Sequence, residues 1–383
     1  MKAGSPAGGR FGDHVPMDTG SSRGRPRTVW TGDPAMKILA LDLGKFKSTA
    51  CLYDGKDGGV KYRTIKTAPF VLWDLIGRWE PDRVVFEVGT AAGWVHDVVA
   101  SVEGVEIEVA NPNHEGWRWR HVKRKTDRLD ALKLARLSAV GQLPQVYVPS
   151  ASVRQRRALV RYREQLVSRR TRSKNTIRSL VHAQGRRMPG GRAGWTQASV
   201  SKLWKMARDW SEAGEGLWRG MLGEELASLK AVCEQLARVE AKLDELGAAD
   251  PATRLLRTIP GVGPRTAEAI AAAIDDPHRF ANGKQVASYA GLTPRQFQSG
   301  QMERSGRISK QGQALLRKLL VEVGWLTLRY NPHLAAFYHR VRRGSPGRRK
   351  IAVVAVARKL LVTAWAMLRD GRAWSPPPVA EVA

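Results

Sequence analysis

Four acidic residues in the first third of the chain have the types and spacing of a metal site. Asp42 and Glu87 each end a short run of apolar and β-branched residues that is typical of a buried strand. Asp127 and Asp130 lie three apart at the start of a helical pattern, so their side chains can share one face. Mg²⁺ prefers oxygen ligands, and two such ions can hold a phosphodiester for in-line displacement. The four carboxylates therefore predict a site for Mg²⁺, with two ions expected and Mn²⁺ as a substitute, that cuts nucleic acid.

Each acid also has a structural interpretation. Asp42 could be a turn residue before Gly44, and Asp127 could be an N-cap or a first-turn acid that the helix dipole favours. For any single residue, this interpretation is about as good as the catalytic one. The order and context of all four together favour the metal site.

The charge of the whole chain indicates a polyanionic partner. Its 383 residues include 64 Lys and Arg against 35 Asp and Glu, a formal charge of +29. Such a charge favours nucleic acid, and salt should weaken the binding steeply through counterion release. No apolar run approaches the roughly 20 residues that span a bilayer. Cys51 and Cys233 form no metal-ligand pattern, so we expect a reducing, cytoplasmic and nucleoid-associated location.

Residues 37 to about 150 alternate strand-like and helical patterns. The strand-like runs are KILALDL, STACLYD, VKYRTIKT, RVVFEV and VEIEVANP, and the helical ones are PFVLWDLIGRW, AAGWVHDVVASV and 127–140. This order predicts a mixed α/β sheet covered by helices. Acids on the first strand, on a later strand and on a late helix match the layout of the ribonuclease-H superfamily, and within it the RuvC type.

A basic, tryptophan-rich segment precedes the last two acids. In GWRWRHVKRKTDRLD, indole rings that can stack on bases alternate with cations that can meet phosphates. The alternative is a solvated basic loop whose tryptophans anchor in the core, and we favour nucleic-acid contact. The predicted contact residues are Trp117, Arg118, Trp119, Arg120, Lys123, Arg124 and Lys125.

Two long helices are predicted between residues 151 and 250. The first, 151–182, is Arg-rich, and the glycines and proline of QGRRMPGGRAG end it. Apolar residues of the second recur at alternating spacings of four and three, which suits an antiparallel helical hairpin or an intermolecular coiled coil. Packing within one chain is not excluded. The stripe consists of Leu222, Leu226, Leu229, Cys233, Leu236 and Leu243.

The third region opens with LLRTIPGVGPRTAEAIAAAI, which has the helix-hairpin-helix pattern. Gly261 and Gly263 permit a tight turn whose backbone N–H groups, at a helix N-terminus, can bind a phosphate without reading sequence. The pattern is only moderately specific, and it gains weight in a chain this basic.

A loop rich in hydroxyls, Arg and Gly follows. Ser299, Ser305 and Ser309 are candidate nucleophiles, although a serine in such a loop is usually a turn or cap residue, and the pattern does not choose among them. Beyond the loop, five cations precede an apolar helix and indicate RNA or DNA contact more than a solvated face. They are Arg342, Arg343, Arg348, Arg349 and Lys350.

Two unrelated sets of motifs in a fixed order give the chain a family resemblance. LDLGKFK, FEVG and NPNHEGWRWRHVKRKTDRLDA are followed by IPGVGPRTA, YAGLTPRQFQSG and GRISKQGQALLRKLL. This succession, over about 37 to 370, resembles the transposases of the insertion-sequence IS110 family, which join a RuvC-like DEDD domain to a C-terminal domain of the transposase 20 type through helical segments.

The resemblance implies a DNA recombinase that excises and inserts its own element, guided by a structured non-coding RNA that bridges donor and target DNA. It implies that the acidic tetrad is Asp42, Glu87, Asp127 and Asp130, and that the catalytic serine, which follows AGLTPR and precedes a glycine, is Ser299. It also implies a homo-oligomer, a dimer or tetramer, in which one site draws serine and acids from different protomers.

Local chemistry adds two residues and leaves two other functions open. Arg295 and Lys310 are basic residues near Ser299 that can stabilise the pentacovalent phosphate. One alternative is a metal-dependent, structure-specific nuclease such as a junction resolvase, in which water attacks and Ser299 is structural. The other is a non-catalytic nucleic-acid-binding protein derived from a transposase.

The predicted fold class is α/β plus α. We expect a disordered tail over 1–35 with the folded chain starting at Met36, where translation could also start, and a RuvC-like domain of ribonuclease-H fold over 36–150. A helical, coiled-coil segment over 151–250 and a mostly helical transposase domain with the helix-hairpin-helix over 251–372 follow. A second disordered tail covers 373–383.

Overall fold

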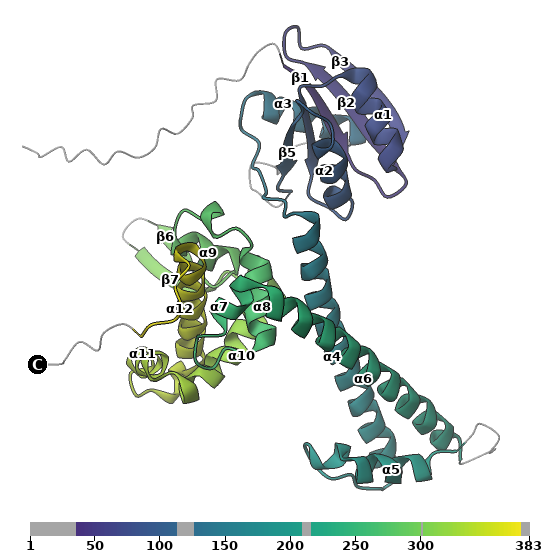
Figure 1. Cartoon of the computed structure of the whole chain (residues 1–383), viewed down its shortest axis with the longest axis vertical. Helices are drawn as coiled ribbons and strands as arrows, with labels where there is room; N and C mark the ends of the chain where they lie inside the picture. The colour runs from purple at the N-terminus through teal and green to yellow at the C-terminus, as the bar shows by residue number, and fades with distance from the viewer. Residues whose placement is uncertain (1–35, 113–125, 209–215, 300–301, 377–383) are drawn as a thin grey trace, which may run out of the picture. The chain divides into compact units, whose positions relative to one another are not determined.

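A computed structural model describes residues 36–112, 126–208, 216–299 and 302–376 of the chain. The chain divides into two compact units, 1–148 and 149–383, and each is described here by itself. The first unit holds a five-stranded sheet with helices, and the second is helical apart from one two-stranded hairpin. The predicted fold class, α/β plus α, is confirmed (Figure 1). The two terminal tails lie almost wholly outside the described residues.

The sheet of the first unit is mixed, with strand order β3-β2-β1-β4-β5. Strands β1 and β2 pair antiparallel, as do β2 and β3, whereas β1, β4 and β5 run parallel to one another. Branched and apolar residues favour these strands, and they are buried along most of β1 and β4. The strands are β1 (Lys37–Asp42), β2 (Lys47–Asp54), β3 (Val60–Lys66), β4 (Arg83–Glu87) and β5 (Glu106–Ala110).

Helices cover both faces of this sheet, as two separate cores show. One core joins Leu39, Leu41 and Phe86 to α1 (Pro69–Trp79) and α2 (Ala92–Ala100). The other joins Ile38, Ala40 and Val85 to α3 (Asp127–Ala139) through Ala131, Leu134 and Ala135. Because side chains alternate between the faces of a strand, odd and even positions of β1 enter different cores.

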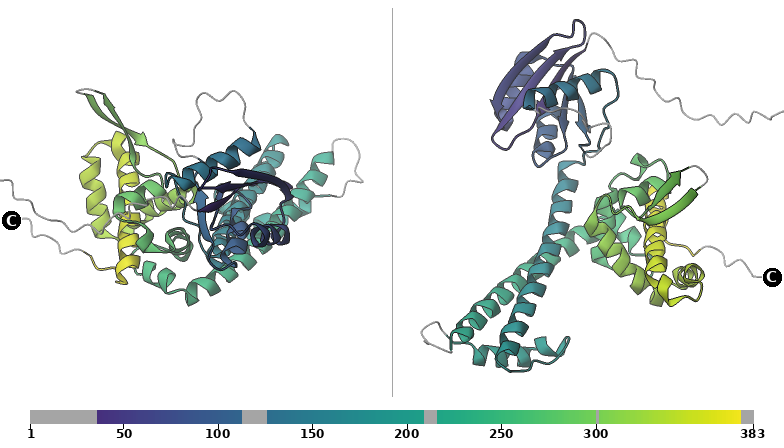
Figure 2. Two further views of the ribbon diagram at one scale, coloured as in Figure 1. Left: turned by 90° about the horizontal axis from the view of Figure 1, so that it is seen from above. Right: turned by 180° about the vertical axis from the view of Figure 1, so that it is seen from behind.

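Two 33-residue helices open the second unit and pack against each other as a hairpin (Figures 1 and 2). Helix α4 (Ala151–Ala183) meets α6 (Leu217–Ala249) in antiparallel order, since Leu166 packs against Val232 and Leu236 while Ile177 packs in the cluster of Leu222 and Leu226. The antiparallel hairpin is therefore formed within one chain, which is one of the arrangements the leucine stripe left open.

One residue of the predicted stripe was assigned wrongly. Cys233 is exposed, and its neighbour Val232 enters the seam instead. An α-helix advances 100° per residue, so over three turns the 3.6-residue period drifts away from a strict four-three pattern, and the adjacent position faces the partner helix.

Shorter helices form the rest of the second unit, and most pack around α12, whose core residues include Val356, Leu360 and Leu361. The elements are η2 (Ala193–Trp195), α5 (Gln197–Met206), α7 (Pro251–Leu256), α8 (Pro264–Ile274), η4 (Pro277–Arg279), α9 (Gly283–Tyr289), β6 (Pro294–Ser299), β7 (Met302–Ile308), α10 (Ala314–Tyr330), α11 (Pro332–Arg342), η5 (Pro346–Arg348) and α12 (Arg349–Asp370).

The expectation that no segment approaches the length of a membrane span needs one correction. The helical stretch Pro346–Asp370 is long and apolar enough by length and composition. Half of its most apolar window is buried inside the fold, as in a core helix, so this is weak evidence for a membrane span.

Candidate functional site

Asp42 and Glu87 are the last residues of two neighbouring parallel strands. In the register of β1 and β4, Leu41 lies beside Phe86, so the next step along both strands brings Asp42 beside Glu87. Neighbouring strands lie about 4.8 Å apart. Both acids are half-buried, at the carboxyl edge of the sheet where chain turns replace the next strand residues. Apolar strand residues thus deliver two carboxylates to one edge.

The two acids also belong to the same face of the sheet. Asp42 continues the alternation of Ile38 and Ala40, and Glu87 continues that of Val85. These three apolar residues belong to the core beneath α3. Asp42 and Glu87 therefore lie on the face that α3 covers.

Helix α3 presents its N-terminal end toward that edge. Arg83, the first residue of β4, donates through Nη1 to the hydroxyl and the carbonyl oxygen of Ser138, near the C-terminal end of α3, at 3.2 and 3.4 Å. The helix therefore runs back along the sheet from the start of β4 toward its end. From Ser138 to Asp127 a helix spans about 16 Å, and from Arg83 to Glu87 a strand spans about 13 Å. The first turn of α3 thus reaches the level of the strand ends.

The first turn of α3 carries the remaining two acids. Thr126 caps the helix by accepting a hydrogen bond from the backbone N–H of Leu129 at 3.4 Å. Asp127 is exposed and Asp130 is half-buried. Each lies one helical turn before a buried residue of α3, Asp127 before Ala131 and Asp130 before Leu134. Acids are favoured in the first turn of a helix because the helix dipole is positive there. The positions of Asp127 and Asp130 therefore have a structural explanation as well as a catalytic one.

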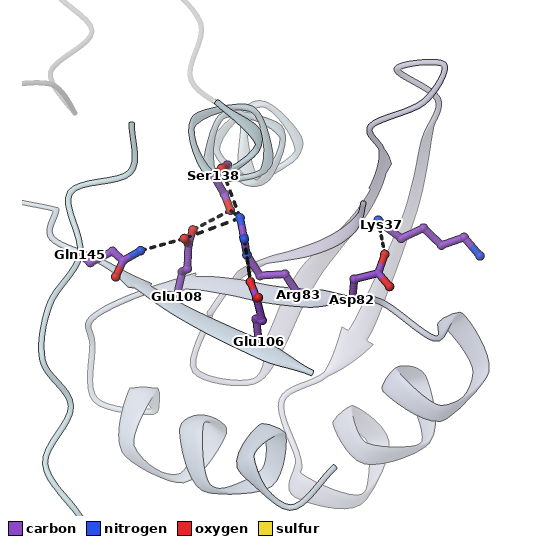
Figure 3. A network of polar contacts seen from close by, with 7 residues as sticks. All are labelled: Lys37, Asp82, Arg83, Glu106, Glu108, Ser138 and Gln145. Carbon is purple, nitrogen blue, oxygen red and sulfur yellow. Dashed lines mark hydrogen bonds and ion pairs between the residues drawn. The ribbon is translucent and has the colours of Figure 1, made fainter. Parts of the chain in front are cut away.

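A buried ion network fixes the other end of α3 (Figure 3). Arg83 is 5% exposed. It donates to Glu106 on β5 at 2.6 and 2.8 Å and lies 3.6 Å from Glu108. The Ser138 hydroxyl donates to Glu108 at 2.6 Å, and the Gln145 amide donates to the same carboxylate at 2.7 Å. Helix α3 is tied through this network to β4 and β5.

The four acids nevertheless do not close into a ligand set. Among the described residues, no three His, Cys, Asp or Glu side chains lie close enough to hold a metal ion. The Arg128 guanidinium lies 5.5 Å from the Tyr62 ring of β3, so part of the first turn of α3 extends over the outer strands. An all-carboxylate set at one edge fits the donor preference of Mg²⁺.

Ser299 lies in the second unit, as the last residue of β6. Its backbone pairs with Met302, the first residue of β7. The side chains of Ser299 and Ser305 lie outside the described residues. Ser309 lies after β7, where its backbone N–H donates to the Thr293 carbonyl at 2.8 Å. Among the candidate serines, Ser299 thus lies where β6 ends, and Ser309 lies beyond the hairpin strands.

The sequence matches two models of one protein family. Residues 39–183 match the model of the IS110 DEDD transposase domain, and residues 253–339 match "Transposase IS116/IS110/IS902 family". The chain is 31% identical over 328 residues to a protein of Sinorhizobium fredii that is named as a transposase, covering 77% of this chain and 79% of the relative. The chain belongs to the IS110 family of transposases.

Two further relatives span a similar share of this transposase. It is 28% identical to the transposase for insertion sequence element IS1111A of Coxiella burnetii, over 77% of this chain and 79% of the relative. It is also 28% identical to the pilin gene-inverting protein of Moraxella bovis, over 70% and 74% of the two chains.

A search of solved structures finds the RuvC protein of Thermus thermophilus. The match covers 29% of this transposase and all of RuvC, with 15% identity and a TM-score of 0.21. The family that the motifs predicted is confirmed by the family models and the relatives.

The predicted nucleic-acid contacts of the transposase lie in different parts of the chain. The tryptophan-rich segment, Trp117 to Lys125, lies outside the described residues. Gly261 adopts φ +90°, and an added Cβ would lie 3.0 Å from Thr327 of α10, so the turn needs glycine for packing as well as conformation. Gly263 is the exposed N-cap residue of α8. The helix-hairpin-helix turn is formed, and its role in phosphate binding stays a prediction.

The predicted cations of the second unit are mostly exposed. Arg295 and Lys310 are exposed on and after the hairpin strands, and Lys310 adopts φ +56°. Arg348 is half-buried and donates through Nε to the Val341 carbonyl at 3.2 Å, so part of its role is structural. Arg349 lies 6.0 Å from the Trp325 ring, and Lys350 is exposed. Arg342 is half-buried and Arg343 ends α11 in the left-handed conformation.

Sequence reasoning missed the network of Arg83, Glu106, Glu108 and Ser138. A signal was present, because Arg83 opens an otherwise apolar strand and the acids of EIEVA alternate on one face. A charged residue at the start of a buried strand needs an opposite charge on a neighbouring strand. The missing information was which strand lies beside β4.

Proposed function

We propose that this transposase excises and inserts its element by metal-dependent cleavage of DNA strands, with Ser299 as the nucleophile. One observation carries the proposal: Asp42 and Glu87 end adjacent parallel strands on the face covered by α3, whose first turn holds Asp127 and Asp130. Closely spaced carboxylates repel one another, and a divalent cation between them relieves that repulsion.

The carboxylates of Asp42, Glu87, Asp127 and Asp130 would hold divalent ions, with Mg²⁺ as the physiological candidate. Bound there, the ions would stabilise the charge that develops on the phosphate and on the attacking and leaving oxygens. Carboxylates also keep DNA away from the sheet edge by repulsion until that charge is neutralised. The roles of the network around Arg83 are to fix α3 and so the spacing of these acids.

The Ser299 hydroxyl attacks the scissile phosphorus. A bond from its Oγ to phosphorus forms as the bond from phosphorus to O3′ breaks, which leaves a phosphoserine and a free 3′ hydroxyl. Attack by another 3′ hydroxyl on the phosphoserine reverses the step on a new strand, so that exchange needs no ATP. Arg295 and Lys310 stabilise the phosphate during both steps.

Strand exchange agrees better than simple cleavage with the name of one relative. The Moraxella bovis relative is named for inverting a gene, which requires cut ends to be rejoined in a new order. A guide RNA, a homo-oligomer that brings serine and acids together, and a cytoplasmic, nucleoid-associated location complete the proposal. Strongly basic chains bind both kinds of nucleic acid through phosphates.

The acids are tested by their neutral isosteres. We expect Asp42→Asn, Glu87→Gln and Asp130→Asn each to lower Mg²⁺-dependent cleavage of element-end DNA by about a hundredfold or more, because each removes a metal ligand. DNA binding should stay near wild type. Cleavage is measured on labelled DNA with Mg²⁺ and with chelator.

Glu103→Gln is the matched control, since Glu103 is an exposed acid of the same unit. Mg²⁺ should raise the melting temperature of the wild type and of the control more than that of the three variants. Wild-type cleavage in all three variants would refute the metal site.

A further inference from the structure

A groove in the second unit is lined by cations that the sequence motifs did not single out. It has a volume of about 850 Å³ and lies between α9, α11 and α12. Helices α9 and α11 both pack against α12 (Figure 1). The charged residues that line it are Lys284 of α9 and Arg358 and Lys359 of α12, and Phe337 of α11 forms an aromatic wall.

Two cations flank the aromatic wall. The Lys359 ammonium lies 4.7 Å from the centre of the Phe337 ring, and the Arg340 guanidinium lies 5.4 Å from it. Burial and the positive charges of Lys359 and Arg340 lower the pKa of nearby His333. Burial is the larger cause, and the two cations act in the same direction.

The cations of the groove differ in their partners from two half-buried cations elsewhere in the second unit. Arg163 and Arg265 pair with Glu240 and Asp244. By contrast, among the described residues no carboxylate lies within ion-pair distance of Lys284, Arg358 and Lys359, which line the groove, or of Arg340 beside Phe337, and no acid lines the groove. Cations held together without acids repel one another, so a fold that keeps them gains from an anion between them.

The groove is shaped by close packing. An added Cβ at Gly283 would lie 2.7 Å from Cγ1 of Val362, so α9 approaches α12 as closely as a glycine allows. Lys284 follows directly, on the exposed side of the same helix. The cations therefore line two helices, α9 and α12, that pack closely against each other.

We propose that this groove binds the phosphodiester backbone of DNA, as a holding site distinct from the acids and Ser299. The inference rests on the proposed function in one respect, that the substrate is DNA. Phosphate contacts of this kind position a duplex without reading its sequence, which suits an open groove with ammonium and guanidinium groups on two sides.

The test is the binding of element-end DNA by the full chain across a salt series. The variant Arg358→Gln with Lys359→Gln should bind about tenfold or more weaker near 0.1 M salt. The slope of log affinity against log salt should fall by about two, one for each lost phosphate contact. Lys242→Gln is the control, because Lys242 is exposed and already paired with Glu245, and it should leave affinity and slope unchanged.

Lys284→Glu is the second variant, because Lys284 is exposed on α9 and can change without disturbing the α12 core. It should weaken DNA binding at least as much as replacing one groove cation by a neutral residue. Circular dichroism should show that both variants are folded. The proposal would be overturned if the folded variants kept the wild-type DNA affinity and salt slope. It would also be overturned if they lost RNA binding and kept DNA binding. Asp130→Asn, measured in parallel, separates the two claims: it should lose cleavage and keep the full salt slope.

Discussion

At the scale of single residues, the acids of the proposed metal site and Glu268 differ in their exposure to solvent. Those of the proposed metal site lie half-buried or exposed at a sheet edge, where a cation can reach them. Glu268 of α8 is 3% exposed, and among the described residues neither of its oxygens accepts a hydrogen bond, although Arg265 lies 3.3 Å away. Burial raises the pKa of Glu268 to about 7, against the partial effect of Arg265.

Glu268 predicts a pH dependence of stability. Below pH 4.5 the carboxyl is protonated in both states, whereas between pH 4.5 and 7 only the folded state holds the proton. Because the unfolded state then binds fewer protons, stability falls as pH rises through this window, by about 3 kcal/mol at most. Glu268→Gln should lack this component. The measurement is urea unfolding of wild type and variant at pH 4.5, 6 and 7.5.

Exposed Glu245 supplies the control, because Glu245→Gln should reproduce the pH profile of the wild type. A difference between wild type and Glu268→Gln that is constant over pH would show that the carboxyl titrates alike in both states.

At the scale of elements, the position of α3 depends on the Arg83 network. Arg83→Ala leaves Glu108, whose side chain is 12% exposed, without its cation, and we expect the free energy of unfolding of the first unit to fall by about 3 kcal/mol. Cleavage should also fall, because the first turn of α3 loses its anchor. Thermal unfolding and the cleavage assay measure the two effects.

Arg78→Ala is the matched control for that change. Arg78 forms an exposed pair with Asp74 on α1, so its loss should cost less than about 0.5 kcal/mol. Equal destabilisation by the two substitutions would show that the buried network does not hold α3.

The helical hairpin gives a second prediction at this scale. Val232→Ala in the buried seam should lower the free energy of unfolding of the second unit by about 1 to 2 kcal/mol. Cys233→Ala, at the exposed neighbouring position, should change it by less than about 0.5 kcal/mol. Chemical denaturation compares the two, and the reverse order would place Cys233 in the seam, as the four-three spacing predicted.

Elements were largely predictable from sequence, and contacts between them only in part. Apolar runs ending at Asp42 and Glu87 indicated both strands, because burial on two faces leaves a continuous apolar pattern. Alternation could not show that β4 pairs with β5, and so it could not reveal the contacts of Arg83 with Glu106 and Glu108. The choice of Val232 over Cys233 likewise depends on helix rotation against a particular partner.

At the scale of the whole molecule, the proposed chemistry divides between two compact units. The carboxylates lie in 1–148 and Ser299 in 149–383. The sequence pattern at each of these two places also has a structural explanation, because acids stabilise helix N-termini and serines often occupy turns. The family resemblance implies Ser299, whose backbone lies at the end of β6.

The most direct test is to identify the atom that becomes joined to DNA. The full-length transposase is incubated with Mg²⁺ and element-end DNA, the covalent species is isolated, and the modified peptide is mapped by mass spectrometry. The account predicts a phosphodiester on Ser299, lost in Ser299→Ala while DNA binding persists, and retained in Ser309→Ala. Cleavage with no covalent species, or an unchanged adduct in Ser299→Ala, would contradict it.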